Sequence, residues 1–154
     1  MRALVALLIL SVPAAATAPP PATPPATPFG PMSRADIESD LFGRTIEGHY
    51  ASGEAFAETL SRDLTSHYTD PDATTTGVMS FDGNALCFAY PEVGDMSGGC
   101  FRVWQRSQNC FDFYVHDDAG KPRAGFAAQL IGTDWTARVW RTDAEPSCPI
   151  APIS

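Results

Sequence analysis

The 154-residue chain is short of basic residues. It has 10 lysine and arginine residues against 18 aspartate and glutamate residues, which gives a formal net charge of -8 at pH 7. Proteins that bind nucleic acid neutralise phosphates with clustered positive charge, so this balance argues against a nucleic-acid partner. The acidic excess is better explained by solubility than by recognition of a particular partner. A basic macromolecular partner is the alternative.

The chain also has no hydrophobic run at its start that could cross a bilayer as a helix. The apolar run at residues 3–12 has about ten residues, whereas a transmembrane helix needs about 20. Arg2 precedes this run, and Pro13 and three alanines follow it. This is the layout of a secretory signal peptide, so we expect residues 1–16 to be removed and the product to be soluble in the periplasm or outside the cell.

Motifs for nucleophilic catalysis and metal binding are missing. The sequence has no Gly-x-Ser-x-Gly, no His-Glu-x-x-His, no phosphate-binding glycine loop and no Cys-x-x-Cys pair. His49 and His67 are expected on the outer face of the sheet, two strands apart, which is too far for one zinc ion. We expect no metal and no cofactor, and an enzyme is the less favoured class. A hydrolase, the third alternative, would depend on Glu58 and the histidines.

A proline-rich segment precedes the part of the chain that is expected to fold. Residues 17–32 hold seven of the 14 prolines and repeat the unit Pro-Pro-Ala-Thr. We expect a solvated polyproline-type linker, with recognition as a proline-rich ligand as the alternative. The remaining residues, 33–154, are enough for one hydrophobic core and are predicted to form a single β domain.

The pattern of residues 33–154 predicts an all-β fold with one short helix. Ser33, with Asp36 three positions later, is a helix N-cap signal, and Gly43 ends the helix. Turn residues then recur at intervals of about 8 to 12, which is typical of sandwiches and barrels. We predict an antiparallel meander that forms a barrel or half-barrel, with strands at 44–50, 54–60, 63–69, 75–81, 84–91, 99–105, 109–116, 124–131 and 135–142.

Alternation of side chains between residues 79 and 115 defines two faces. The turn Asp82-Gly83 predicts a hairpin in which Phe81 faces Asn84, and the third hairpin should place Phe101 opposite Phe113. One face carries no charge and is expected to be the core: Met79, Phe81, Leu86, Phe88, Phe101, Val103, Phe111, Phe113 and Val115. A second apolar patch is expected between strands 124–131 and 135–142, from Phe126, Ala128, Leu130, Trp135, Ala137 and Val139.

The cysteines lie on the opposite face of the same strands. Four cysteines allow three pairings, and the register of the second hairpin places Cys87 opposite Cys100, which favours that disulfide. Cys110 is then left for Cys148, which would attach the C-terminal segment to the sheet. A metal site is the competing interpretation, but the expected compartment is oxidising.

Two groups of residues are candidates for ligand binding. Glu58 shares its face with Phe56 and Leu60, and the next strand should place Ser66 across from it, beside Tyr68. A carboxylate among apolar neighbours is costly unless it has a partner, so we predict that Glu58 is at least partly buried with one. It either lines a ligand cavity inside a barrel or is an internal anchor that bonds Ser66 and a tyrosine.

The second group is aromatic and lies on the disulfide face. It consists of Trp104, Tyr114 and Trp140. These side chains are a candidate platform for a sugar or an apolar ligand. The alternative is that the N-terminal helix or the C-terminal tail covers them, because large exposed apolar patches are uncommon on monomers.

Several short motifs carry a resemblance to known proteins. Gly43, Gly48 and Asp82-Gly83, together with LCF at 86–88, GGCF at 98–101 and NCF at 109–111, resemble a group of small exported bacterial proteins of uncharacterised function. The resemblance spans about residues 35 to 116 and implies no catalytic residues. The order of elements also resembles lipocalin-like barrels in architecture, with Gly43-Arg44-Thr45 where lipocalins carry Gly-x-Trp.

Together these observations favour a monomeric, non-catalytic binding protein for a small apolar or carbohydrate ligand. The alternative is an interaction module or inhibitor that binds another exported protein through loop 91–98 or the acidic surface.

Overall fold

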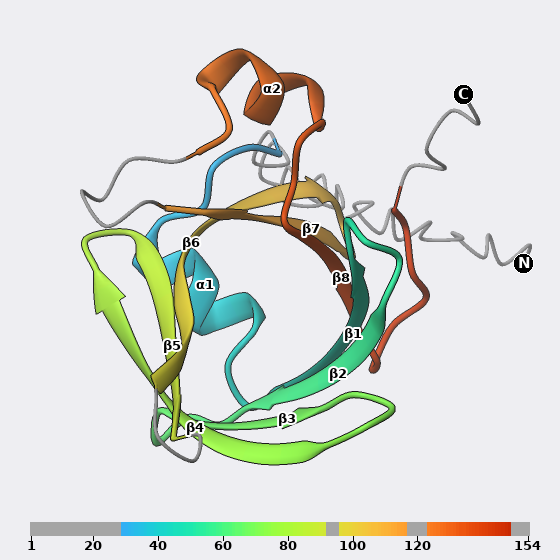
Figure 1. The fold of residues 1–154 in the computed structure, drawn as a ribbon. Helices are drawn as coiled ribbons and strands as arrows, with labels where there is room; N and C mark the ends of the chain where they lie inside the picture. The colour runs from blue at the N-terminus through green and yellow to red at the C-terminus, as the bar shows by residue number, and fades with distance from the viewer. Residues whose placement is uncertain (1–28, 92–95, 117–122, 149–154) are drawn as a thin grey trace, which may run out of the picture.

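The computed structural model describes residues 29–91, 96–116 and 123–148 (Figure 1). The predicted signal peptide lies outside the described residues, as does the predicted linker up to residue 28 and the central part of loop 91–98.

Eight antiparallel strands form a closed barrel. Each strand pairs with the next along the chain, and β8 pairs with β1 to complete the ring. The predicted all-β antiparallel meander with one N-terminal helix is therefore confirmed, as a full barrel. The strands are β1 (Arg44–Tyr50), β2 (Ala55–Leu60), β3 (Thr65–Thr69), β4 (Thr74–Asp82), β5 (Ala85–Pro91), β6 (Met96–Ser107), β7 (Cys110–Val115) and β8 (Ala137–Arg141).

The N-terminal helix, α1 (Arg34–Asp40), closes one end of this barrel. It begins at the predicted N-cap, where the backbone N–H of Ser33 donates to Asp36 Oδ2 at 3.0 Å and the backbone N–H of Asp36 donates to Ser33 Oγ at 3.3 Å. Ile37 of the helix and Leu41, its C-cap, are fully buried in the barrel core. Figure 1 looks along the barrel and shows α1 within the ring of strands.

The predicted core face is confirmed, although two of the three hairpin registers are wrong. Cys87 does lie opposite Cys100, but Phe81 faces Leu86 instead of Asn84. The two-residue turn is Gly83-Asn84, because Gly83 takes the first central position, where φ is positive (+57°). Phe101 faces Val115 instead of Phe113.

The second shift has a local cause. Ser107 faces Cys110, so the β6–β7 turn lies at Gln108-Asn109, and a register irregularity between Gln105 and Ser107 then shifts the pairing by one residue, which keeps Phe101 and Phe113 on the same face. Both errors displace the pairing by two residues. Because side chains alternate with a period of two, every predicted core residue still faces the barrel interior.

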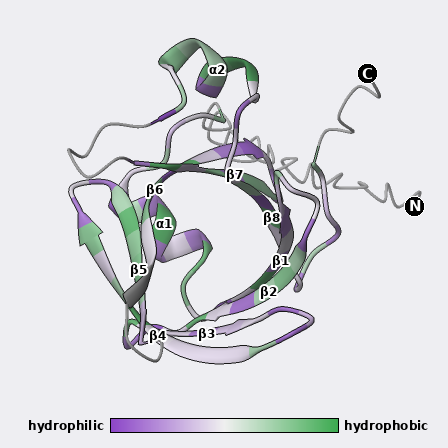
Figure 2. Cartoon of the chain, viewed as in Figure 1, coloured by the Kyte–Doolittle hydropathy of each residue, from purple (hydrophilic) through white to green (hydrophobic). Residues whose placement is uncertain are grey.

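The predicted strand at 124–131 is wrong, because this segment forms the short helix α2 (Phe126–Ile131) outside the barrel (Figure 2). Its alanines, glutamine and leucine favour a helix, and Gly132 ends it in the left-handed conformation at φ +79°. The predicted second apolar patch is therefore absent: Phe126 and Leu130 are exposed on α2, whereas Ala137 and Val139 are buried in the barrel. No helix in the described part of the chain is both long and apolar enough to span a membrane.

Candidate functional site

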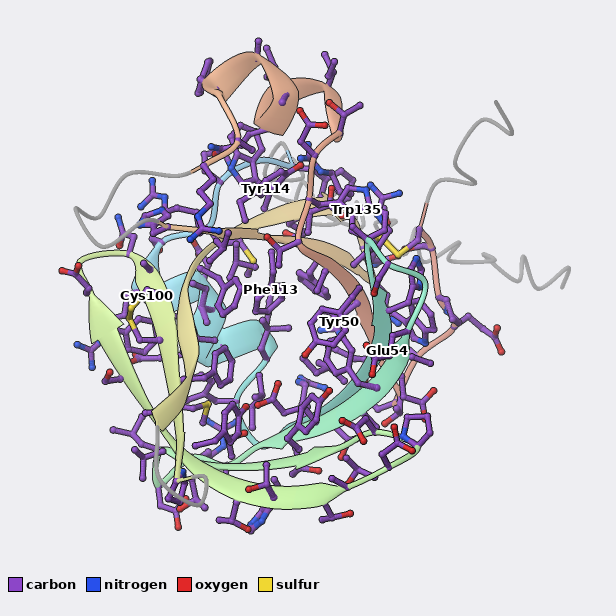
Figure 3. All side chains as sticks on the ribbon, viewed as in Figure 1. Tyr50, Glu54, Cys100, Phe113, Tyr114 and Trp135 are labelled. Carbon is purple, nitrogen blue, oxygen red and sulfur yellow. A yellow bond between two sulfur atoms is a disulfide. The ribbon has the colours of Figure 1, made fainter. Side chains whose placement is uncertain are left out.

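The barrel encloses a cavity of about 600 Å³. This lies within the range of roughly 300–1,000 Å³ that small-molecule sites occupy. The cavity reaches the end opposite α1, where Asp70 and Ala73 follow β3 and Pro91 ends β5. Its described lining is rich in aromatic rings: Tyr50, Phe56, Tyr68, Phe88, Tyr90, Phe101 and Phe113. Figure 3 shows Tyr50 and Phe113 pointing into the barrel.

The rings on one side of the cavity form a continuous stack. Phe56 stacks on Tyr50 at 4.6 Å between ring centroids and on Tyr68 at 5.7 Å, and Tyr68 lies 5.8 Å from Tyr90. The hydroxyl of Tyr50 donates to that of Tyr68 at 3.3 Å. Strand alternation brings these residues together, since each lies at an inward position of β1, β2, β3 or β5.

Glu58 lies within this aromatic region. It is only 6% exposed, and its Oε1 accepts hydrogen bonds from both Ser66 Oγ and the Tyr90 hydroxyl. The prediction that Glu58 is buried with a polar partner is confirmed. The register differs from the expected one, because Tyr68 faces Glu58 and Ser66 faces Leu60.

Burial controls the ionisation of this cluster. Loss of hydration raises the pKa of Glu58, while the hydrogen bonds from Ser66 and Tyr90 act in the opposite direction. Burial also raises the pKa of Tyr90, Tyr68 and Tyr50, so their hydroxyls stay protonated. Among the described residues Glu58 forms no salt bridge. The cavity therefore contains an acid whose charged form has no cationic partner.

Glu58→Gln should become more stable relative to the wild type as pH rises. The raised folded-state pKa of Glu58 contributes stability that is fully present below the unfolded pKa and is lost as pH rises through the folded pKa. Glutamine keeps the acceptor oxygen but has no charge to bury, so its stability should not fall over this interval. The measurement is urea unfolding of both proteins at several pH values between about 4 and 8.

The exposed Glu47 on β1 supplies the control for this measurement. Glu47→Gln should give a profile parallel to that of the wild type, because its side chain is in water in both states. A stability difference between Glu58→Gln and the wild type that does not vary with pH would contradict the assignment.

The other two ligand-binding candidates lie outside the cavity. Trp104 and Tyr114 are 4% and 0% exposed. Tyr114 points away from the barrel interior toward α2 (Figure 3), and the ring of Trp104 lies 6.1 Å from that of Phe126 on α2. The indole N–H of Trp104 donates to Gln129 Oε1 of α2 at 2.9 Å. The backbone of residues 30–32 pairs with β6 beside Trp104, through hydrogen bonds to Val103 and Gln105. The cover is thus α2, in place of the expected N-terminal helix or C-terminal tail.

A buried ion cluster holds α2 against the barrel. Asp112 is fully buried and accepts from Arg106 Nε at 2.6 Å and from Arg138 Nε at 2.7 Å. Both guanidinium groups also donate to backbone carbonyls at the end of α2: Arg106 to Gln129 and Leu130, and Arg138 to Gly132. Asp112 lies on the outer face of β7, between the inward-facing Phe111 and Phe113, and the sequence has no signal that this face is covered.

Both predicted disulfides, Cys87–Cys100 and Cys110–Cys148, are formed. They indicate an oxidising, extracytoplasmic setting. In the described ranges, no three or more His, Cys, Asp or Glu side chains are grouped so as to hold a metal ion. The histidines His49 and His67 stand on outward positions of β1 and β3, as expected.

Sequence reasoning missed Tyr90, which donates to Glu58, although a tyrosine partner was anticipated. The signal was present, because Tyr90 shares the inward positions of β5 with Leu86 and Phe88. Comparison with known proteins found no matching family model, no matching curated protein and no matching solved structure.

Proposed function

We propose that the protein binds a small, largely apolar molecule inside the barrel without converting it chemically. The observation that carries this proposal is the cavity of about 600 Å³, lined by aromatic rings and containing one buried polar cluster, Glu58, Ser66 and Tyr90. Small-molecule sites have this composition: a mostly apolar wall with a few polar groups that orient the ligand.

The strand number supports the same conclusion. An eight-stranded barrel is wide enough either to be filled by its own side chains or to hold one small ligand, as lipocalins do. Here Ala73, Gly98 and Ala137 bring little or no side chain to the lining, which leaves room beside the rings. Most of the described lining is aromatic or aliphatic, so an apolar body is favoured over a carbohydrate.

The proposed location is the periplasm or the outside of the cell. The two disulfides and the signal-peptide layout of residues 1–16 support export. The alternative of an interaction module that uses loop 91–98 stays a prediction, since residues 92–95 lie outside the part of the chain that the structure describes.

Thr75→Trp should weaken the binding of a neutral fluorescent dye such as Nile red. Thr75 lines the cavity from β4, so an indole at this position would occupy the space that the ligand needs. We expect saturable one-to-one binding by the wild type and a loss of affinity of at least about tenfold in the variant, as for a ligand that loses part of its buried surface. Fluorescence titration measures both.

Thr76→Trp is the matched control, because the neighbouring residue is exposed on the outer face of the same strand. It should bind the dye as the wild type does. Absence of saturable binding by the wild type, or equal affinities of wild type and Thr75→Trp, would refute the proposal.

A further inference from the structure

We propose that the ligand is a cationic amine, with its ammonium group against Glu58 and an apolar, ring-bearing body in the aromatic part of the cavity. This inference rests on the proposed function, since it names the chemical class of the molecule that the cavity holds.

The first argument is the charge of the cavity. The side chains described as lining it include two carboxyl groups, Glu58 and Asp70, and no lysine, arginine or histidine. A buried carboxylate is normally paired with a cation, because desolvation is otherwise costly. The buried guanidinium groups of Arg106 and Arg138 are on the outer side of the wall, where they bind Asp112. No described side chain of the lining supplies a positive charge for ionised Glu58, so we assign that charge to the ligand.

The second argument is the geometry of the carboxyl group. Ser66 and Tyr90, 3.2 Å apart at their hydroxyl oxygens, both donate to the same oxygen of Glu58, Oε1. The other oxygen, Oε2, accepts no hydrogen bond from any described residue, although Glu58 lines the cavity. An ammonium group carries up to three donors and forms short, strong hydrogen bonds with carboxylates. Oε2 is placed to accept one of them.

The third argument is the arrangement of the rings around Glu58. Phe56 is two residues before Glu58 on β2, and Tyr68 faces Glu58 from β3. Phe56 also stacks on Tyr50 at 4.6 Å between centroids. The faces of aromatic rings attract cations within about 6 Å, and the attraction grows when water is excluded. The rings and the carboxylate therefore favour the same charged group.

Proton linkage gives the binding a characteristic pH dependence. Only ionised Glu58 pairs with an ammonium group, and burial raises the pKa of Glu58 in the empty barrel. The affinity for an amine should therefore rise as pH passes through the raised pKa of Glu58, and then stay level until the amine loses its proton, near pH 10 for a simple alkylamine.

The other titratable groups of the described lining do not change this expected pH dependence of amine binding. Tyr50 on β1, Tyr68 on β3 and Tyr90 on β5 keep their protons, because burial raises the pKa of each hydroxyl. Asp70 stays charged, because backbone hydrogen bonds from Asp72 and Ala73 lower its pKa. The cavity-lining residues of β4, β6, β7 and β8 that the structure describes carry no titratable side chain.

The test compares three probes that share one body: phenylbutylamine, phenylbutanol and phenylbutyrate. Isothermal titration calorimetry of the full chain should show that the cationic amine binds about tenfold or more tightly than the neutral alcohol, and that the anion binds most weakly. Glu58→Gln should lose this preference for the amine while it keeps the affinity for the alcohol. Glu47→Gln, an exposed glutamate on the outer face of β1, should behave as the wild type.

Two results would overturn the inference: an alcohol or anion that binds the wild type as tightly as the amine, or an undiminished preference in Glu58→Gln. The pH profile of the wild type provides a second measurement that needs no variant, since amine affinity should rise as pH passes through the raised pKa of Glu58 while alcohol affinity stays level. Failure of the proposed function would differ, because then neither the three probes nor the neutral dye would bind.

Discussion

Asp112→Asn is expected to lower the free energy of unfolding by about 3–5 kcal/mol. The substitution keeps the size of the side chain but removes the negative charge that pairs with two poorly exposed guanidinium groups. Those of Arg106 and Arg138 are only 11% and 7% exposed, so both would be left in a poorly hydrated place without a counter-charge. Urea unfolding monitored by tryptophan fluorescence measures the effect as a change in midpoint.

The exposed Asp143 provides a matched control. It pairs with Arg44 and Arg141, but its side chain is 48% exposed, so Asp143→Asn should cost less than about 1 kcal/mol. Hydrogen exchange distinguishes the two further, because α2 should lose protection in Asp112→Asn alone. If the two variants were equally stable, Asp112 would not be the anchor that we describe.

Removing the Cys110–Cys148 disulfide, as Cys110→Ser with Cys148→Ser, should lower the free energy of unfolding by about 4 kcal/mol. The two residues are 38 positions apart, and the bond restricts the unfolded chain over that whole length. A small domain is stabilised by only about 5–15 kcal/mol in total, so the loss is a large fraction. Denaturant unfolding of the double variant and the wild type under non-reducing conditions gives the difference.

The hairpin disulfide supplies the comparison. Cys87 and Cys100 are 13 positions apart, and the chain-entropy estimate for their loop is about 3 kcal/mol. Their removal should therefore cost less than removal of the long-range bond. Asn109 also attaches the C-terminal segment, because its side-chain amide donates to the carbonyls of Arg141 and Ala144. We therefore expect the variant without Cys110–Cys148 to keep the native fold, so that the two losses of stability can be compared. A reversed order would refute the entropic explanation.

The sequence was sufficient to predict the barrel wall because its strands alternate cleanly. Phe88, Phe101 and Phe113 all point inward, as a period of two requires, and Cys87 faces Cys100 in the predicted register. Alternation is tolerant of error, because a slip of two residues leaves each side chain on the same face. This explains why the core and both disulfides were correct although two hairpin turns were not.

Features that depend on a single turn or on tertiary cover could not be predicted in the same way. Asp82-Gly83 fits two turn types that differ in which residue takes the positive φ, and only the folded hairpin selects one. Residues 126–131 have alternating apolar residues but also good helix formers, and the ion cluster below them favours the helix. Propensity over six residues is too weak to decide this alone.

The candidate site was predicted in part for a related reason. The apolar neighbours of Glu58 at positions two residues away indicated that it faces inward, and Ser66 and Tyr68 followed from the next strand. Whether the interior is filled or hollow depends on the fit of side chains from all eight strands, which no local pattern contains. Trp104 and Tyr114 look like a binding platform in sequence because nothing near them marks the cover supplied by α2.

Pairing of β8 with β1 also bears on how this chain avoids aggregation. Once the ring is complete, each of the eight described strands has a neighbour on both sides, so this sheet presents no free edge of backbone donors and acceptors to a second molecule. The first and last strands can meet only after the intervening ones have been synthesised and ordered. Until then both carry unpaired edges, and the hazard of intermolecular strand addition is confined to that interval of folding.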